Sequence, residues 1–215
     1  MRTAGLGSGK SGLFDRENIG MEDYADCIKK ILDTEKIAHC SMIGHSMGGY
    51  ITLAFAEKYP GSLSSFGLFH SSAYADDEAK RATRKKAIDF IKTNGAEAFL
   101  KTSIPGLFYD QGNSGPADAL IEKGKAFSSK ALLSYYTSMI NRPDRTNVLK
   151  SFSNPLLFVM GEHDNAVPFQ QSLQQCYPPQ KAHVHILRNS AHMGMLEETE
   201  RSNQILAQFL RSATT

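Results

Sequence analysis

The sequence has few cysteines, no long apolar run and no strong excess of charge of either sign. Its three cysteines, Cys27, Cys40 and Cys176, form no CxxC pair, which argues against a disulfide framework or a zinc site and favours a reducing compartment. No stretch reaches the roughly 18 apolar residues of a membrane span, and residues 1–30 contain no apolar signal core. We therefore predict a cytoplasmic location and no membrane partner.

The charge balance also limits the partners. Lysine and arginine number 24, and aspartate and glutamate 22, so the formal net charge of +2 creates no field that would favour nucleic acid. One local basic run has the spacing of the solvent-facing side of a helix: Lys80, Arg81, Arg84, Lys85 and Lys86. With 41% hydrophobic and 21% charged residues, a chain of 215 residues is expected to form one folded domain with at most a small insertion.

Short apolar runs alternate with helical patterns towards both ends of the chain. This alternation is typical of βα units around a parallel sheet, so we predict an α/β fold. The predicted strands are Ile37–Ile43, Ser64–Phe69, Pro155–Met160 and His183–Leu187. The predicted helices of this core are Gly48–Lys58, Phe169–Cys176 and Glu198–Ala213.

The middle of the chain, residues 71–150, shows helical patterns and no convincing strand. The predicted helices here are Glu78–Thr93, Ala117–Lys125 and Lys130–Ile140. Gly95 and Pro105 interrupt the segment, as expected for several helices joined by turns. We therefore predict a helical insertion between the two halves of an α/β core, 1–70 and 151–215.

The strongest chemical signal is the run GHSMGG at residues 44–49, which lies between a predicted strand and a predicted helix. A serine on such a strand-to-helix turn is the nucleophile elbow of one class of hydrolases. Side chains at Gly44 and Gly48 would collide with neighbouring backbone in this turn, which accounts for the glycines. Ser46 then stands at a helix N-terminus, where the amide of Met47 can donate to a developing oxyanion.

A serine is a weak nucleophile at neutral pH and needs a base that is oriented by a third group. Asp164 follows an apolar strand at Gly-x-x-Asp spacing, and we prefer it as the acid to the neighbouring Glu162. His192 lies in the loop after the last predicted strand, at the sheet edge where function concentrates in parallel sheets. His45, inside the elbow, is expected to pack and not to react. The order Ser46, Asp164, His192 is that of one hydrolase architecture.

These segments resemble the α/β-hydrolase superfamily, in its lidded esterase and lipase-like branch. GHSMGGY, a helix ending in AEKYP, and then RPDRTNVLKSF, NPLLFVMGEHDNAVP and SAHMGMLEE are similar to that family's blocks in sequence and order. The resemblance implies a parallel-sheet core with 71–150 as a helical cap over the site. It also implies an acyl-enzyme route without metal or organic cofactor, in which Ser46 is the nucleophile, Asp164 the acid, His192 the base and the Met47 amide one oxyanion donor.

The sequence departs from the pattern of this family at the N-terminus. Members usually begin with four more strands, and the loop after the third carries an HG-type motif that supplies a second oxyanion amide; neither precedes the strand predicted at Ile37–Ile43. The opening GLGSGKSG resembles the loop after the family's fourth strand. We therefore expect a sheet that is incomplete at the N-terminus, with an exposed edge strand that favours a homodimer. Ala4–Ser11 also fits a relaxed nucleotide-binding loop, but it lacks the preceding strand and following helix that such a loop needs.

The predicted reaction is hydrolysis of a small-molecule carboxylic ester, thioester or lactone through an acyl intermediate on Ser46, with His192 as general base and then acid. His70 and Ser71, at the carboxyl end of a predicted strand, are candidates for the pocket wall. Perhydrolysis of the haloperoxidase type, C–C bond hydrolysis and aminopeptidase activity use the same triad and stay open. A second hypothesis is a catalytically dead remnant that acts as a binding or dimerising module, because losing one oxyanion donor costs on the order of 100-fold to 1000-fold in rate.

Overall fold

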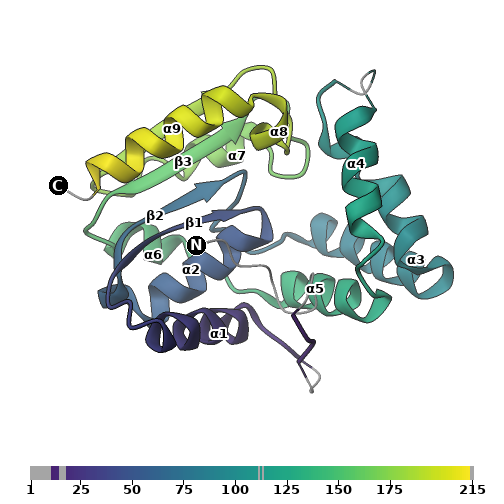
Figure 1. The fold of residues 1–215 in the computed structure, drawn as a ribbon, viewed down its shortest axis with the longest axis horizontal. Coiled ribbons are helices and arrows are strands. Elements are labelled where there is room, and N and C mark those ends of the chain that lie inside the picture. Colours follow the sequence, from purple (N-terminus) through teal and green to yellow (C-terminus); the bar gives the residue numbers. More distant parts are fainter. Residues whose placement is uncertain (1–10, 15–17, 111, 113, 214–215) are drawn as a thin grey trace.

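The structure, a computed structural model, describes residues 11–14, 18–110, 112 and 114–213. The described strands form one parallel sheet in the order β1-β2-β3-β4 (Figure 1). The strands are β1 (Cys40–His45), β2 (Leu63–Phe69), β3 (Leu156–Gly161) and β4 (Ala182–Leu187). The predicted α/β class is confirmed, and the carboxyl ends of these strands meet at one edge of the sheet.

Helices cover both faces of the sheet. They are α1 (Met21–Thr34), α2 (Met47–Lys58), α7 (Phe169–Gln174), α8 (Gly194–Glu197) and α9 (Thr199–Ser212), with a 3₁₀ turn, η1 (Pro60–Ser62). Consecutive side chains of a strand point to opposite faces, so Leu156 and Phe158 of β3 join the core that contains α1 and α2. Leu157 and Val159 join the opposite core with Phe209 of α9. Figure 1 shows α1 and α2 on one side of the sheet and α9 on the other.

A helical segment connects β2 to β3. It comprises α3 (Glu78–Ser103), the 3₁₀ turn η2 (Pro105–Leu107), α4 (Gly115–Gly124), α5 (Ser129–Asn141) and α6 (Thr146–Ser151). The described part of this segment contains no strand, as predicted. Figure 1 shows α3, α4 and α5 beside the sheet, on the side to which the strand arrows point. The division of the chain into a core and a cap stays a prediction.

The long helix α3 extends beyond the predicted Glu78–Thr93. It continues through a kink at Gly95, where φ is 82°, a left-handed value that glycine adopts without a side-chain clash. The N–H of Ala96 donates to Oγ of Ser129 at 3.1 Å, which ties the kink to α5. The interruption predicted at Gly95 is therefore present: its φ and ψ are non-helical, and the helical stretches before and after it meet at a kink.

The helices α1 and α6 are absent from the prediction. α1 buries Met21, Tyr24, Ala25 and Leu32, whose spacing is that of one helix face. Its start carries a weak signal, because the N-cap is Gly20 and not one of the usual Ser, Thr, Asp or Asn. α6 has only 6 residues, too few for a helical period to show.

The first strand is shifted from its prediction. β1 runs over Cys40–His45, and the prediction was Ile37–Ile43. Pairing with β2 sets its extent, since Gly44 lies opposite Leu68 and His45 opposite Phe69. The prediction follows the apolar residues, which indicate burial, whereas the ends of a strand are set by its hydrogen bonds to the neighbouring strand. β1 is one edge of the sheet formed by the described strands, and pairing of two chains through it stays a prediction.

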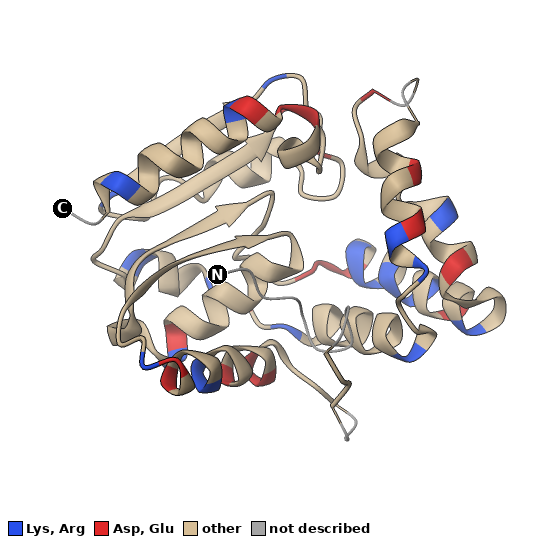
Figure 2. Cartoon of the chain, in the orientation of Figure 1, with Lys and Arg blue, Asp and Glu red and all other residues tan. Residues whose placement is uncertain are grey.

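Charged residues lie on the helices and loops and not on the strands (Figure 2). Among the described residues, no helix combines the length and apolarity needed to cross a membrane. The exposed members of the basic run on α3 are Arg81, Lys85 and Lys86. Lys80 and Arg84 turn inward, contrary to the predicted solvent-facing side: Lys80 Nζ donates to the carbonyl of Ala166, and Arg84 pairs with Asp76.

Candidate active site

The turn between β1 and α2 holds Ser46 in a strained conformation. Its φ is 51° and its ψ −120°, and non-glycine residues rarely adopt a positive φ. A Cβ at Gly44 would lie 2.2 Å from the carbonyl oxygen of Gly48, and a Cβ at Gly49 would lie 2.2 Å from Oγ of Ser71. A Cβ at Gly48 would meet no described atom within 4 Å. The predicted collision therefore holds for Gly44 and is wrong for Gly48, whose expected role falls to Gly49.

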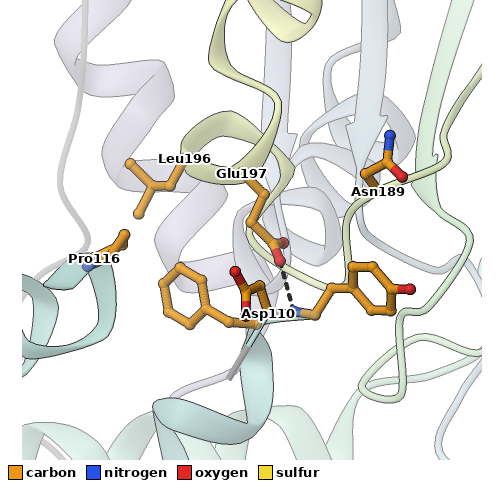
Figure 3. Close-up of a pocket in the computed structure, with 7 residues that line it drawn as sticks. Asp110, Pro116, Asn189, Leu196 and Glu197 are labelled. Carbon is orange, nitrogen blue, oxygen red and sulfur yellow. Dashed lines mark hydrogen bonds between the residues drawn. The ribbon is translucent and has the colours of Figure 1, made fainter. Parts of the chain in front are cut away.

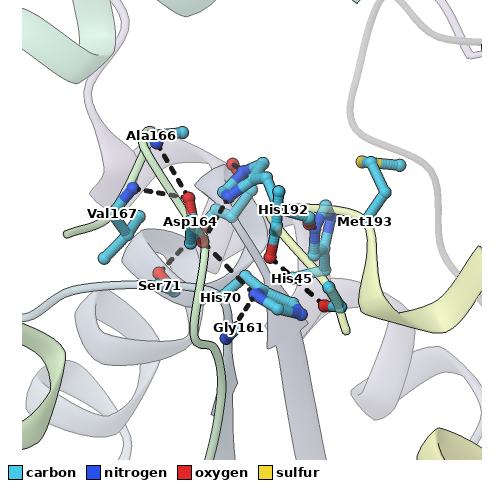
Figure 4. Close-up of polar contacts among 12 residues, drawn as sticks. His45, His70, Ser71, Gly161, Asp164, Ala166, Val167, His192 and Met193 are labelled. Carbon is cyan, nitrogen blue, oxygen red and sulfur yellow. Dashed lines mark hydrogen bonds and ion pairs between the residues drawn. The ribbon is translucent and has the colours of Figure 1, made fainter. Parts of the chain in front are cut away.

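Three side chains at the carboxyl edge of the sheet form one chain of hydrogen bonds. Ser46 follows β1, Asp164 follows β3 and His192 follows β4. Oγ of Ser46 lies 2.8 Å from Nε2 of His192, and Nδ1 of His192 lies 2.8 Å from Oδ2 of Asp164 (Figure 4). Glu162, the rival acid, is exposed and lies outside this chain. The structure thus brings the three predicted residues within the reach of about 2.6–3.2 Å that proton transfer needs.

The carboxylate of Asp164 is buried among N–H donors. Its side chain is 1% exposed, and Oδ1 accepts from the backbone N–H groups of Ala166 and Val167 at 2.8 Å each. Burial alone would raise the pKa of Asp164, but the hydrogen bonds from His192 and His70 outweigh it and hold that pKa well below its usual range. Asp164 is therefore ionised at neutral pH and can receive the Nδ1–H of an imidazole.

The loop that carries His192 is fixed through its backbone. The N–H of His192 donates to the carbonyl of Leu107 at 2.9 Å, and its carbonyl oxygen lies 2.9 Å from Nε2 of His45. A carbonyl only accepts, so Nε2 of His45 carries the proton. Burial, with a smaller contribution from His192, lowers the pKa of His45 to about 3, so its ring is neutral at neutral pH. His45 thus acts as a hydrogen-bond donor to the backbone of the predicted base.

Glu197, on α8, connects the His192 loop to the helical segment. Its Oε2 accepts from the N–H groups of Ala191 at 3.0 Å and Met193 at 3.2 Å, which flank His192 in the chain. Its Oε1 accepts from the N–H of Tyr109 at 2.6 Å, just after η2 (Figure 3). One carboxylate therefore holds both neighbours of the predicted base. Glu197 is hard to recognise in the sequence because it stands among several glutamates, and only its position shortly after His192 distinguishes it.

His70 and Ser71 are buried next to the hydrogen-bonded chain of Ser46, His192 and Asp164. Nδ1 of His70 lies 3.2 Å from Oδ2 of Asp164, and the His70 side chain is 0% exposed. Oγ of Ser71 donates to the carbonyl of Ser46 at 2.7 Å, and Ser71 is 4% exposed. Both side chains therefore contact the residues of the hydrogen-bonded chain, and their role in lining the pocket stays a prediction.

Met47 is the first residue of α2. The first N–H groups of a helix have no intrahelical acceptor, and the helix dipole favours negative charge beside them. The position of Met47 therefore suits an oxyanion donor, and that role stays a prediction. Residues 4–10, which carry the expected family loop and the nucleotide-binding alternative, lie outside the described residues.

One group of described residues has the composition of a metal site. His70, Asp164 and His192 place potential ligand atoms within 4.8 Å of one another. The two Nδ1 atoms, however, lie 3.2 Å and 2.8 Å from the same carboxylate oxygen, which are hydrogen-bond distances. Zinc would need nitrogen and oxygen ligands at about 2.0–2.2 Å from a common ion. Hydrogen bonding accounts for this arrangement, so we assign no metal to it.

Two clefts flank the chain after η2. One, of about 640 Å³, is lined by residues that include Phe108, Tyr109, Leu196 and Glu197 (Figure 3). The other, of about 600 Å³, shares Phe108 and Tyr109 and reaches Asp164. The Tyr109 ring stacks on His163, with ring centroids 3.8 Å apart and planes 10° apart. Space for a small molecule therefore lies on both sides of Tyr109, close to the loops of Asp164 and His192.

Solved structures show which fold this is. A thermophilic esterase from Thermogutta terrifontis, with malate bound, matches with a TM-score of 0.85 at 24% identity, over 98% of this chain and 79% of that one. The enol-lactonase from Burkholderia xenovorans matches with a TM-score of 0.83 at 18% identity, over 96% of this chain and 78% of that one. The fold is that of the α/β-hydrolases, as the sequence blocks suggested.

Sequence comparison adds the family. The family described as serine aminopeptidase, S33, matches residues 2–199, and the chain belongs to it. The 2-hydroxy-6-oxononadienedioate/2-hydroxy-6-oxononatrienedioate hydrolase of Paraburkholderia phymatum is 23% identical over 193 residues, which cover 86% of this chain and 67% of that protein. The family and these relatives are hydrolases of the α/β-hydrolase type, so the chain is an enzyme of this class with a hydrolytic role.

Proposed function

We propose that the chain is a serine hydrolase that cleaves a carboxylic ester, thioester or lactone through an acyl intermediate on Ser46. The observation that carries the proposal is the path from Ser46 through His192 to Asp164, in which both hydrogen bonds are 2.8 Å long. The esterase and the enol-lactonase named above, which share the fold, act on bonds of the same class by their names.

Acylation uses the three side chains in sequence. Nε2 of His192 accepts the proton of Ser46 while Oγ attacks the substrate carbonyl carbon, and the carbonyl oxygen becomes an oxyanion. This charge develops beside the N-terminus of α2, where the N–H of Met47 stabilises it. The imidazolium of His192, stabilised by ionised Asp164, then protonates the leaving oxygen, the bond from the carbonyl carbon to that oxygen breaks, and acyl-Ser46 remains.

Deacylation repeats these steps with water. Nε2 of His192 takes a proton from water, the hydroxide oxygen attacks the acyl carbon, and a second oxyanion forms at the same place. His192 then returns the proton to Oγ of Ser46 as the acyl bond to Ser46 breaks. The carboxylic acid leaves and the free serine is restored, so the cycle consumes one water for each ester.

We further propose that the helical segment forms part of the wall of the substrate-binding space. In the proposed organisation, residues 71–150 form a cap, and Phe108 and Tyr109 divide the space between cap and core into the two clefts described above. Aromatic and aliphatic walls near a few polar groups suit a small organic ester. Glu197 already accepts three backbone N–H groups, which leaves its carboxylate little capacity to bind a substrate ammonium group.

The proposal is tested with an activity-based probe and a substrate panel. A fluorophosphonate should label the wild-type chain and Ser151→Ala, which changes an exposed serine, and should not label Ser46→Ala. Hydrolysis of p-nitrophenyl acetate and butyrate should likewise depend on Ser46. Unchanged labelling of Ser46→Ala would refute the assignment of the nucleophile.

The same panel separates the rivals. Turnover of an aminoacyl p-nitroanilide in place of the esters would favour an aminopeptidase, the activity for which the family is described. Absence of turnover of every ester by a folded chain would favour the alternative of a binding module without catalysis.

A further inference from the structure

His70 is a third side chain that reaches the predicted acid and base, and the hydrolytic cycle does not use it. We propose that His70 is a positioning residue: it donates its Nδ1–H to Oδ2 of Asp164 and so shares with His192 the oxygen that orients the base. Figure 4 shows both histidines directed at Asp164. This inference rests on the proposed function, because positioning matters only if Asp164 and His192 act in catalysis.

The backbone of His70 is strained in the same sense as that of Ser46. His70 follows β2 and has a φ of 47°, a value that a non-glycine residue keeps only where its surroundings impose it. Its N–H donates to the carbonyl of Val159 at 2.8 Å, which fixes this backbone against β3. The side chain of Ser46 contacts His192, and that of His70 contacts Asp164, the hydrogen-bond partner of His192. Such clustering of strain is typical of functional sites.

The room for the His70 ring is made by a glycine. A Cβ at Gly194 would lie 2.5 Å from Nε2 of His70, so any larger residue there would collide with the ring. The ring is fully buried, and burial lowers the pKa of His70. His70 is therefore neutral at neutral pH, which rules it out as the charged partner of Asp164 and leaves it as a hydrogen-bond donor.

The position of the proton on His70 follows from the two groups that face Nδ1. Oδ2 of Asp164 lies at 3.2 Å, and the N–H of Gly161 also lies at 3.2 Å, so Nδ1 either donates to the carboxylate or accepts from the amide. If the proton were on Nε2, the Nδ1 lone pair would face a carboxylate oxygen, and the buried Nε2–H would have no acceptor among the described residues. A proton on Nδ1 gives up the hydrogen bond from the Gly161 N–H and replaces that repulsion with a charge-assisted hydrogen bond, the stronger type of the two. Nδ1–H is therefore the favoured tautomer.

The shared oxygen has a consequence for the base. Each donor to Oδ2 draws on the same negative charge, so the hydrogen bond from His70 weakens the hold of Asp164 on the imidazolium of His192. The other groups that face His192 are Ser46 and the neutral His45, whose ring centroid lies 5.1 Å away; Glu197 is bonded to the backbone on either side. Removing the His70 donor should therefore strengthen the hydrogen bond between Asp164 and His192 and move the acid limb of the pH–rate profile.

The first test reads the tautomer directly in the wild-type chain. In protein labelled with ¹⁵N-histidine at pH 8, His70 should show a protonated Nδ1 and an unprotonated Nε2, with His70→Asn used to assign the signals. A His70 signal with the proton on Nε2 would overturn the inference, because Nδ1 would then accept from Gly161.

The second test compares two substitutions of His70 that have a similar shape and differ in their ability to donate a hydrogen bond. His70→Asn keeps an N–H donor near the position of Nδ1, whereas His70→Leu has a similar outline without a donor. We expect the acid limb of kcat/KM for p-nitrophenyl butyrate to move upward by about half a pH unit or more in His70→Leu, and to stay near its wild-type position in His70→Asn. A role in packing alone would lower activity at all pH values and leave the limb in place, so an unmoved or lowered limb in His70→Leu contradicts the inference.

The two proposals can fail separately. If the wild-type chain neither hydrolyses the ester nor reacts with a fluorophosphonate, the proposed function fails. If the wild type is active and both His70 variants keep its pH profile, only the role of His70 fails. Thermal melting shows whether His70→Leu is folded, and if it is not, the ¹⁵N measurement on the wild type decides.

Discussion

Replacing Asp164 by asparagine removes the charge that orients the predicted base and keeps the shape of the side chain. The carboxylate uses both oxygens: Oδ1 accepts from the N–H groups of Ala166 and Val167, and Oδ2 from His192 and His70. Asparagine offers one oxygen and one NH₂ group in their place. Whichever way its amide is turned, two donors meet an NH₂ group.

Both orientations of the amide have a calculable cost. If the NH₂ faces His192, Nδ1 must accept, the proton moves to Nε2, and the base can no longer take a proton from Ser46; in a serine protease this error costs about 10⁴-fold in kcat. If the NH₂ faces the Ala166 and Val167 amides instead, two N–H groups lose their acceptor, at about 1–3 kcal/mol each. Because the second orientation costs two hydrogen bonds, we expect the first, with kcat/KM lower by about 10³-fold to 10⁴-fold and the free energy of unfolding lower by at most about 1–3 kcal/mol, the cost of one unpaired donor at His70.

The assay for this substitution is the rate of p-nitrophenyl butyrate hydrolysis together with urea unfolding. Glu162→Gln is the matched control, because it neutralises an exposed carboxylate two residues away and should leave both quantities near their wild-type values. If Asp164→Asn retained activity within about tenfold of the wild type, the assignment of Asp164 as the orienting acid would be refuted.

Three further substitutions test other parts of the account. Gly44→Ala should lower the free energy of unfolding by about 3 kcal/mol or more, because its Cβ would lie 2.2 Å from a backbone oxygen. Gly48→Ala, with open space around its Cβ, should be as stable as the wild type. Equal losses of stability in urea unfolding would contradict the geometry of the elbow. Glu197→Ala should lower kcat/KM by about tenfold or more by freeing the His192 loop, while Glu200→Ala, on the exposed side of α9, should not; equal activities would show that the loop needs no such support. Asp76→Asn should cost about 3–5 kcal/mol at pH 7, because it leaves the buried Arg142 and the partly buried Arg84 without their carboxylate partner. Burial alone would raise the pKa of Asp76, but these arginines hold it below its usual value. The stabilisation is therefore present above about pH 4 and is lost as the pH falls towards the pKa of the folded state. The free energies of unfolding of Asp76→Asn and wild type should converge below about pH 4, and a difference that stays constant with pH would contradict this.

The sequence predicts most of the core because its strands are short apolar runs and its elbow is a local motif. β2, β3 and β4 each fall within one residue of their predicted ranges. β2 and β3 are buried parallel strands, which apolar side chains mark along most of their length. α1 escapes the prediction because its start at Gly20 lacks a strong cap. The interruption at Gly95 is predicted from the sequence, whereas the hydrogen bond from Ala96 to Ser129 that fixes it is not, because it joins residues far apart in the chain.

The site divides in the same way. Ser46, Asp164 and His192 can be named from the sequence because each follows a strand in a recognisable segment, and the structure brings them together. Glu197 and the contact of His70 with Asp164 cannot, because they depend on where the segments after β2, β3 and β4 meet in space. Burial of His70 is likewise a property of the packed fold, and a residue at the end of a strand reads from the sequence as one that faces a pocket.

The central claim is an acyl intermediate on Ser46, and peptide mapping of acid-quenched protein tests it most directly. The chain is mixed with p-nitrophenyl acetate, quenched during turnover, digested and analysed by mass spectrometry. The account predicts an acetyl group on the peptide that contains Ser46, and its absence from Ser46→Ala. An acetyl group confined to another residue, or ester turnover that survives in Ser46→Ala, would contradict it.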